Sequence, residues 1–138
     1  MNLPTRLIPL GFYAAAFVNI AGVLLFSQLY SNGLMSSLYP AVFSNFGLIC
    51  IQLWGLAYWA VAKHWVHVPA LIAVFAVEKL AYAVSWLQWM DQSVQQLPTV
   101  WSASPLTATF YLIYGPTDFA FGLFFVLVAL QARRMRQY

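Results

Sequence analysis

The sequence predicts an all-α integral membrane protein, a four-helix bundle with up-down topology and a kinked fourth helix. Three observations lead to this fold class. Hydrophobic residues make up 63% of the 138 residues and charged residues only 7%, whereas soluble domains contain about 25% charged residues. Four long apolar stretches follow one another, separated by short polar segments. Most of the few basic residues flank these stretches, so lipid must be the solvent for most of the chain.

The apolar stretches have the length needed to cross a bilayer. A helix rises 1.5 Å per residue, so a hydrocarbon core of about 30 Å needs about 20 mostly apolar residues. The predicted spans cover about residues 10–30, 41–62, 68–90 and 105–131 of a single domain, residues 1–138. The first stretch is too long for the core of a signal peptide and no small-residue cleavage pattern follows it, so we expect an uncleaved helix.

Polar segments rich in turn-forming residues separate the spans. Residues 31–39 contain Asn-Gly and several serines and are expected to form a turn or short loop. Residues 63–67 are expected to form a tight loop, and residues 91–104 the longest polar loop. A proline suited to the first helical turn opens each of the last three spans, at Pro40, Pro69 and Pro105. These signals support the four predicted boundaries.

The basic residues predict the orientation. With four spans, the N-terminus, the loop after the second span and the C-terminus lie on one side. That side carries Arg6, Lys63, Arg133, Arg134 and Arg136. The other two loops carry no Lys or Arg, so the positive-inside rule places both termini in the cytoplasm. We therefore expect a protein of the cell inner (plasma) membrane, with the lipid bilayer as its main partner.

Aromatic residues near the end of the second span indicate where this span reaches the membrane–water interface. Two of the residues Trp54, Tyr58 and Trp59 are expected, together with Trp65, to form part of an interfacial aromatic belt.

Each predicted span carries one strongly polar residue near the bilayer midplane. These residues are Asn19, Gln52, Glu78 and Asp118. Each lies about 15–20 Å from its own membrane face at helical rise. Since alternate spans run in opposite directions, all four are expected to meet in one layer. Small neighbours such as Gly115 and Gly122 let helix backbones approach, so the polar groups can point inward.

The charges in this layer do not balance. A charge at the bilayer centre costs on the order of 3 kcal/mol, so it persists when paired inside the protein. Adjacent helical residues point about 100° apart, so Lys79 is expected to pair with Asp118 or with a neighbouring chain rather than with Glu78. One carboxylate then lacks a cationic partner. Because burial favours the neutral form of a carboxyl group, we expect Glu78 or Asp118 to hold a proton near neutral pH, or to bind a cationic ligand.

Two tyrosines are expected to continue the polar lining. Tyr82 shares a helical stripe with Glu78, and Tyr114 lies one turn before Asp118. The candidate ligand-binding or proton-binding residues are therefore Glu78, Asp118, Lys79, Asn19, Gln52, Tyr82 and Tyr114. No catalytic residue is assigned, and a purely structural polar cluster is the alternative.

The fourth span contains Gly115-Pro116, after an N-cap expected at Ser104. Proline removes a backbone donor and clashes with the preceding turn, so a kink or a break is expected. Either would free the carbonyl of Leu112, and irregular backbone in a membrane is tolerated where it lines a cavity.

Several other classes of function find no support. His64 and His67 have no carboxylate or cysteine near them, so no metal site is expected. Cys50 is alone, so no intrachain disulfide can form. The chain has no phosphate-binding loop, nucleophile elbow or other catalytic motif, and no cofactor is expected. The net charge of +3 is spread along the chain, which argues against nucleic-acid binding.

The best-supported hypothesis is the binding or transport of a small solute, coupled to protonation of Glu78 or Asp118. A chain this short would need a homodimer or a larger membrane complex to form a transport path. One alternative is a membrane enzyme that moves a proton on a lipid-soluble substrate, with Lys79 or Tyr82 stabilising charge. Another is a subunit or assembly factor in which Lys79 faces a partner. The architecture resembles small four-span families such as the DoxX-like proteins, but no motif of theirs is matched and no function is taken from them.

Overall fold

The computed structural model describes residues 3–136, which are almost entirely helical. Of these residues, 86% are helical and none forms a strand. Three helical segments are long and apolar enough to cross a membrane: Ile8–Phe26, Pro69–Ala103 and Pro105–Met135. The apolar helix α5, Asn45–Val61, is shorter. The all-helical class is therefore confirmed, and the apolar helices are those expected of a membrane protein.

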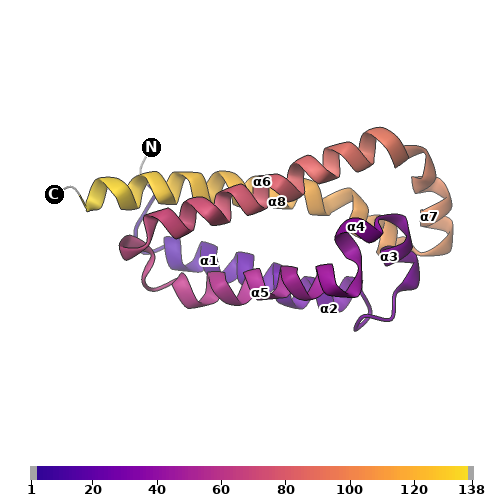
Figure 1. Ribbon diagram of the computed structural model, residues 1–138, viewed down its shortest axis with the longest axis horizontal. Coiled ribbons are helices and arrows are strands. Elements are labelled where there is room, and N and C mark those ends of the chain that lie inside the picture. The colour runs from indigo at the N-terminus through magenta and orange to yellow at the C-terminus, as the bar shows by residue number, and fades with distance from the viewer. Residues whose placement is uncertain (1–2, 137–138) are drawn as a thin grey trace.

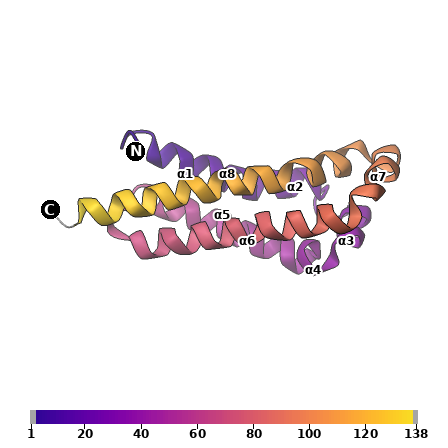
Figure 2. The ribbon, with the colours of Figure 1, turned by 90° about the horizontal axis from the view of Figure 1, so that it is seen from above.

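The long helices lie side by side along one axis (Figure 1). Helix α1 (Ile8–Phe17) packs against α5, and α6 (Pro69–Ser93) packs along α8 (Pro105–Met135) in the most extensive interhelical contact. Both ends of the chain lie at one end of the molecule, and a view turned by 90° shows the same alignment (Figure 2). Three short helices form the opposite end: α3 (Gly33–Leu38), α4 (Pro40–Phe43) and α7 (Leu97–Ala103).

Glycines allow the helices in each pair to approach closely. A Cβ added at Gly115 of α8 would lie 2.1 Å from the Trp86 ring of α6, and one added at Gly55 of α5 would lie 3.0 Å from the Cβ of Asn19. These contacts leave no room for a side chain, as is common where membrane helices pack. The predicted small residue Gly115 therefore lies at a close helix contact, and Gly55, which was not predicted, lies at another.

The first helix is shorter and less regular than predicted. It ends with α2 (Val23–Phe26), after a π-helical turn, η1 (Val18–Gly22). The next residues, Gln28, Leu29 and Tyr30, all have positive φ angles of 50–68°, which ends the right-handed helix. Ser27 supports this turn by accepting a hydrogen bond from the Tyr30 amide at 3.0 Å. The predicted end at residue 30 is therefore four residues too late.

The predicted second span is interrupted at Ser44. Helix α4 ends at Phe43 and α5 begins at Asn45, with Ser44 in an extended conformation between them. The Ser44 hydroxyl accepts a hydrogen bond from the Gly47 amide at 3.2 Å, so the serine caps α5 instead of continuing the preceding helix. The prediction of one continuous helix over residues 41–62 is therefore wrong at its start.

Both predicted polar loops at the end of the molecule opposite the termini contain helix. Helix α3 occupies much of the loop predicted at residues 31–39, because Asn32 caps it by accepting from the Met35 amide at 3.1 Å. In the loop predicted at residues 91–104, α6 continues to Ser93 and is followed by η3 (Val94–Gln96) and α7. Polar composition thus marked where the long helices end and did not exclude short ones.

Helix α8 is continuous through Pro116, so the predicted break is absent. Its N-cap is Ser104, as expected, and the Ser104 hydroxyl accepts from the Thr107 amide at 3.2 Å. Pro116 lies on the exposed side of α8, where its ring and missing donor do not disturb the packing against α6. Leu112, whose carbonyl loses its partner to Pro116, is also exposed. That carbonyl therefore belongs to an outward-facing residue and does not mark the site.

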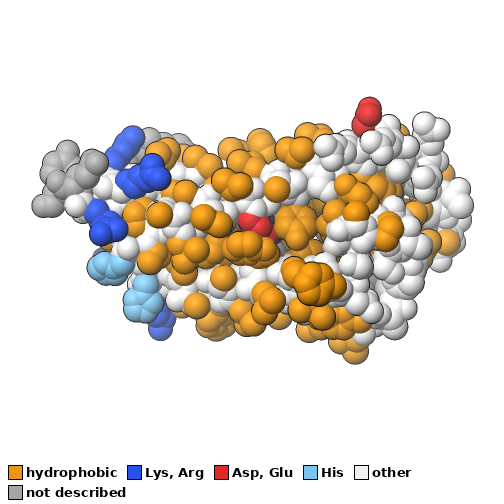
Figure 3. All heavy atoms as spheres, viewed as in Figure 1, with side chains coloured by type: hydrophobic (Ala, Val, Ile, Leu, Met, Phe, Trp, Pro, Cys, Tyr) orange, Lys and Arg blue, Asp and Glu red, His pale blue; other side chains and the backbone are white. Residues whose placement is uncertain are grey.

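Two apolar clusters fill the interior, and hydrophobic side chains cover the outside. The cluster nearer the chain ends includes Phe12, Phe75 and Phe125, and the cluster nearer the short helices includes Phe43 and Phe110. Figure 3 shows hydrophobic side chains along the length of the molecule, with the Lys, Arg and His side chains gathered at the end where the termini lie. This distribution suits a protein whose long surface faces lipid.

Candidate functional site

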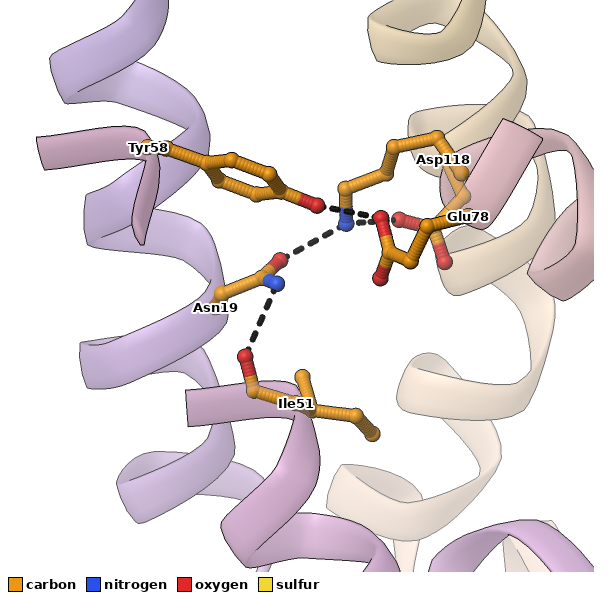
Figure 4. A network of polar contacts seen from close by, with 6 residues as sticks. Asn19, Ile51, Tyr58, Glu78 and Asp118 are labelled. Atoms are coloured by element: carbon orange, nitrogen blue, oxygen red, sulfur yellow. Dashed lines mark hydrogen bonds and ion pairs between the residues drawn. The ribbon is translucent and has the colours of Figure 1, made fainter. Parts of the chain in front are cut away.

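A buried polar network joins four helical segments, η1, α5, α6 and α8, between the two apolar clusters (Figure 4). Lys79 of α6 is only 1% exposed, and its Nζ donates to Asp118 Oδ1 of α8 at 2.5 Å and to Asn19 Oδ1 of η1 at 2.7 Å. The expected pairing of Lys79 with Asp118 is therefore present within one chain. A charge-assisted contact of this kind compensates part of the cost of removing both ions from water.

Asn19 is held in place by the irregular turn that carries it. Its Nδ2 donates to the backbone carbonyl of Ile51 at 3.0 Å, while its Oδ1 accepts from Lys79. These two contacts fix which end of the amide faces the lysine. Single π-helical turns inside α-helices are frequent at functional sites. Residues 18–22 have the composition of an ordinary apolar helix and contain no marker of this turn.

Glu78 has a different partner, which the sequence analysis missed. The hydroxyl of Tyr58 on α5 donates to Glu78 Oε2, and the Lys79 ammonium lies 5.6 Å from the centre of the Tyr58 ring. Tyr58 is wholly buried, so of the three aromatic residues considered for the interfacial belt it is one that does not belong there. The signal was the stripe that Ile51, Gly55 and Tyr58 form at positions i, i+4 and i+7, which is the buried face of α5.

Trp65, the other expected belt residue, is also buried, in the cluster nearer the chain ends. Trp59 is exposed on the outside of α5, where an aromatic side chain can face lipid.

Gln52 does not belong to the network. It accepts a hydrogen bond from the Tyr30 hydroxyl, and its Nε2 donates to the Ile20 carbonyl at 3.4 Å. Gln52 follows the buried Ile51 and therefore points about 100° away from that residue around the helix. The polar group that this helix contributes is the one on Tyr58, six residues or about 9 Å further along.

A cavity of about 80 Å³ adjoins the network. Its lining is mostly aromatic and aliphatic, with Phe43, Phe110 and other apolar side chains. Its polar lining consists of Asn19, Glu78, Lys79, Tyr82, Tyr114, Thr117 and Asp118. The structure thus gathers six of the seven predicted site residues around one space, and Gln52 is the residue it leaves out.

Two polar atoms at this cavity have no hydrogen-bond partner within the described residues. They are Glu78 Oε1 and the hydroxyl oxygen of Tyr114, on residues that are 8% and 7% exposed. Leaving a buried polar group unsatisfied costs about 1–3 kcal/mol, and more for a charged group. Native proteins rarely accept that cost without a bound water, an ion or a functional role. The two atoms therefore indicate a place where something polar binds.

The cavity opens toward the lipid-facing surface. Two of its lining residues, Val18 of η1 and Ile113 of α8, are 38% and 43% exposed. These residues lie on η1 and α8, two segments that make few direct contacts with each other. Segment η1 packs against α5 instead, and α8 packs against α6. The cavity is therefore accessible sideways, between the first helical segment and α8.

The arrangement separates the roles of the two carboxylates. Asp118 is bound to the ammonium of Lys79, whereas Glu78 is bound to the neutral hydroxyl of Tyr58 and keeps one oxygen free. No group of three or more His, Cys, Asp or Glu side chains in residues 3–136 is placed to hold a metal ion. His64 and His67 are exposed at the end where the termini lie.

Comparison of the chain with known protein families, curated proteins and solved structures gives no match. The function is therefore argued from the site alone.

Proposed function

We propose that the protein binds a small molecule in the cavity beside Glu78, and that this carboxyl group exchanges a proton as the molecule enters and leaves. The observation that carries the proposal is the free Oε1 atom of Glu78, buried at the cavity without a partner. Asp118 already holds Lys79, so Glu78 is the group whose charge is left to be balanced. A proton balances it in the free protein, and a bound molecule can do so in its place.

The proposal includes a membrane arrangement. We propose a four-helix bundle of up-down topology in the inner (plasma) membrane, with α5 as its second span and both termini in the cytoplasm. Helix α5 has 17 apolar-rich residues, or about 25 Å at helical rise, and α4 precedes it directly. The basic residues gathered at one end support the orientation.

Binding is the part of the function that this geometry supports best. The cavity is reached from the side, as suits a molecule that partitions into the bilayer. Transport would need a second opening toward water, and a chain of this size would reach it as a dimer or within a larger complex. Binding is better supported than a subunit role in which Lys79 faces a partner, because Lys79 is buried and paired within its own chain.

The binding proposal can be tested with single-chain amphiphiles, because the cavity is narrow and opens to lipid. We suggest octylamine, 1-octanol and octanoate as probes, with retained molecules counted by native mass spectrometry of the protein released from detergent micelles. At least one probe is expected to bind saturably, with one molecule per chain. Ile113→Trp should block this binding by filling the opening, whereas Leu112→Trp, on the neighbouring exposed residue outside the cavity lining, should not.

Two results would contradict the binding proposal. One is the absence of saturable binding for all three probes, and the other is binding that Ile113→Trp leaves unchanged. The tryptophan at an exposed position should not impair folding, and the Leu112→Trp variant controls for the added bulk.

A second candidate function is proton transfer on a lipid-soluble substrate. The lateral opening favours it, as does the position of the Tyr58 hydroxyl and the Lys79 ammonium beside Glu78. A carboxyl group placed in this way can act as a general acid or base. Incubation of proteoliposomes in D₂O would reveal such activity as carbon-bound deuterium in membrane lipids, lost in Glu78→Gln. Binding without any such exchange would leave the binding function alone.

A further inference from the structure

We infer that the molecule bound beside Glu78 is a lipophilic amine, whose cationic head occupies the cavity while its apolar chain extends into the bilayer. This inference rests on the proposed binding function and adds the chemical class of the ligand. Three independent features carry it: the charge of the network, the size of the cavity and the chemistry of the free polar atoms.

The charge of the network favours a monocation. Two carboxylates, Glu78 and Asp118, face one ammonium, Lys79, so the ionised cluster carries one negative charge in excess. An anionic head would add to that excess in a site of low dielectric, at a cost that no contact in the cavity offsets. A neutral head would leave Glu78 in need of its proton. A protonated amine is the head that leaves the ionised cluster neutral.

The size of the cavity limits what enters it. A cavity of about 150 Å³ in another protein accommodates benzene, and this cavity measures about 80 Å³. It can therefore hold an ammonium group and a few carbons, but not a whole amphiphile. The rest of the ligand's apolar tail can leave the cavity between Val18 and Ile113, the two exposed lining residues. Outside the cavity it would lie among lipid tails.

The free polar atoms suit a donor with several N–H groups. Glu78 Oε1 accepts hydrogen bonds when ionised, and the Tyr114 oxygen can accept as well as donate. A primary ammonium has three donors, so it can satisfy Glu78 Oε1 and still donate to another oxygen of the lining. The aromatic wall adds to this, because the rings of Phe110 and Tyr114 stack at 5.1 Å and Phe43 packs edge-on against both. Aromatic faces attract cations, more strongly where water is excluded.

Binding would exchange one cation for another at Glu78. The proton leaves the Glu78 carboxyl group for solvent, and the ammonium takes its place as the counter-ion, so charge is conserved. The charged or titratable groups around Glu78 are Tyr58 from α5, Lys79 and Tyr82 from α6, and Tyr114 and Asp118 from α8, with the amide of Asn19 from η1 beside Lys79. Of these, Asp118 and Lys79 are already paired with each other.

Head-group selectivity tests the inference directly. Octylamine and 1-octanol have the same chain length and differ in the charge of the head. Near pH 7.5, the amine is protonated, as a lysine side chain is. We expect octylamine to bind at least tenfold more tightly than 1-octanol, and octanoate to bind least. In Glu78→Gln, octylamine should lose at least tenfold in affinity and 1-octanol should change little.

Proton release provides a second readout that does not need a variant. Addition of octylammonium chloride to the detergent-solubilised protein in weak buffer near pH 7 should release protons, up to one per bound amine, as reported by a pH-sensitive dye. Addition of 1-octanol should release none. This comparison uses the unaltered chain, so it stands even if Glu78→Gln fails to fold.

The outcomes separate the inference from the function on which it rests. If 1-octanol binds as tightly as octylamine, and Ile113→Trp blocks both, cavity binding stands and the amine is the wrong class. Tighter binding of octanoate, or octylamine binding without proton release, would overturn the inference in the same way. Absence of saturable binding for every probe would overturn both.

Discussion

Lys79 and Asp118 contact each other at 2.5 Å between α6 and α8, and this contact is the only ion pair in the described residues. Both side chains are largely buried, and that of Lys79 is almost completely so. Removal of one partner would leave the other as an uncompensated charge in a medium of low dielectric. Because that is more costly than the loss of a contact between neutral groups, the pair determines much of the stability of the site.

Asp118→Asn should therefore destabilise the protein strongly. We expect a loss of about 3–5 kcal/mol, the usual cost of breaking a buried pair from one side. The free energy of unfolding can be measured by titrating dodecyl sulfate into mixed micelles and following circular dichroism. Asp91→Asn is the matched control, because Asp91 is exposed and should change stability by no more than about 0.5 kcal/mol. Equal effects of the two substitutions would show that the pair contributes no stability.

Tyr58→Phe should weaken the binding of an amphiphilic amine without unfolding the protein. The change removes only the hydroxyl that donates to Glu78 and so makes the ionised carboxylate less stable. Hydrogen bonds to charged groups contribute about 1.5–3 kcal/mol, so octylamine affinity should fall about tenfold or more. Gln52→Leu, which alters a polar residue outside the cavity, should leave the affinity unchanged. An effect of Gln52→Leu as large as that of Tyr58→Phe would argue against this assignment.

Gly115→Ala should loosen the contact between α6 and α8. The added Cβ would lie 2.1 Å from the ring of Trp86, whose Nε1 is tied to the Tyr111 carbonyl at 2.8 Å and cannot move aside freely. Overpacking of this kind costs about 1–3 kcal/mol, measurable in the same unfolding titration. Gly33→Ala is the control, since nothing lies within 4 Å of a Cβ at Gly33. Equal stability of the two variants would mean that the helices can separate at no cost.

The proposed topology can be tested by cysteine labelling in intact cells. In a Cys50→Ala background, a membrane-impermeant maleimide should label Gln92→Cys and not Thr5→Cys, because the two exposed residues are assigned to opposite sides of the membrane. Permeabilised cells should label at both positions. Labelling of Thr5→Cys in intact cells would place the N-terminus outside and invalidate the proposed orientation.

Part of the site followed from the sequence because charge and helical geometry leave few choices. Glu78 and Lys79 lie in the middle of an apolar segment, so they had to face inward, and their adjacency directed Lys79 to Asp118. The position of Asn19 in the site could be predicted from its depth in the first span alone. These residues were predictable because a membrane penalises every polar side chain that lacks a partner.

The remainder of the site depended on rotation and backbone detail. Depth placed Gln52 in the layer but did not determine which side of α5 it faces, and the true partner, Tyr58, looked like an interfacial residue. The π-helical turn at Val18–Gly22 has no marker in its apolar residues. Pro116 left α8 continuous because it lies on the exposed face. Both sides of this helix are apolar, so the sequence does not show which side is exposed.

The central claim is that Glu78 carries the exchangeable proton, and infrared spectroscopy of the amine-free protein in liposomes tests it most directly. The chain has three Asp and Glu residues, so a band from a protonated carboxyl group can be assigned by substitution. We predict such a band at neutral pH in the unaltered protein, its loss in Glu78→Gln and its persistence in Asp91→Asn. Absence of the band in the unaltered protein, or its persistence in Glu78→Gln, would contradict the account.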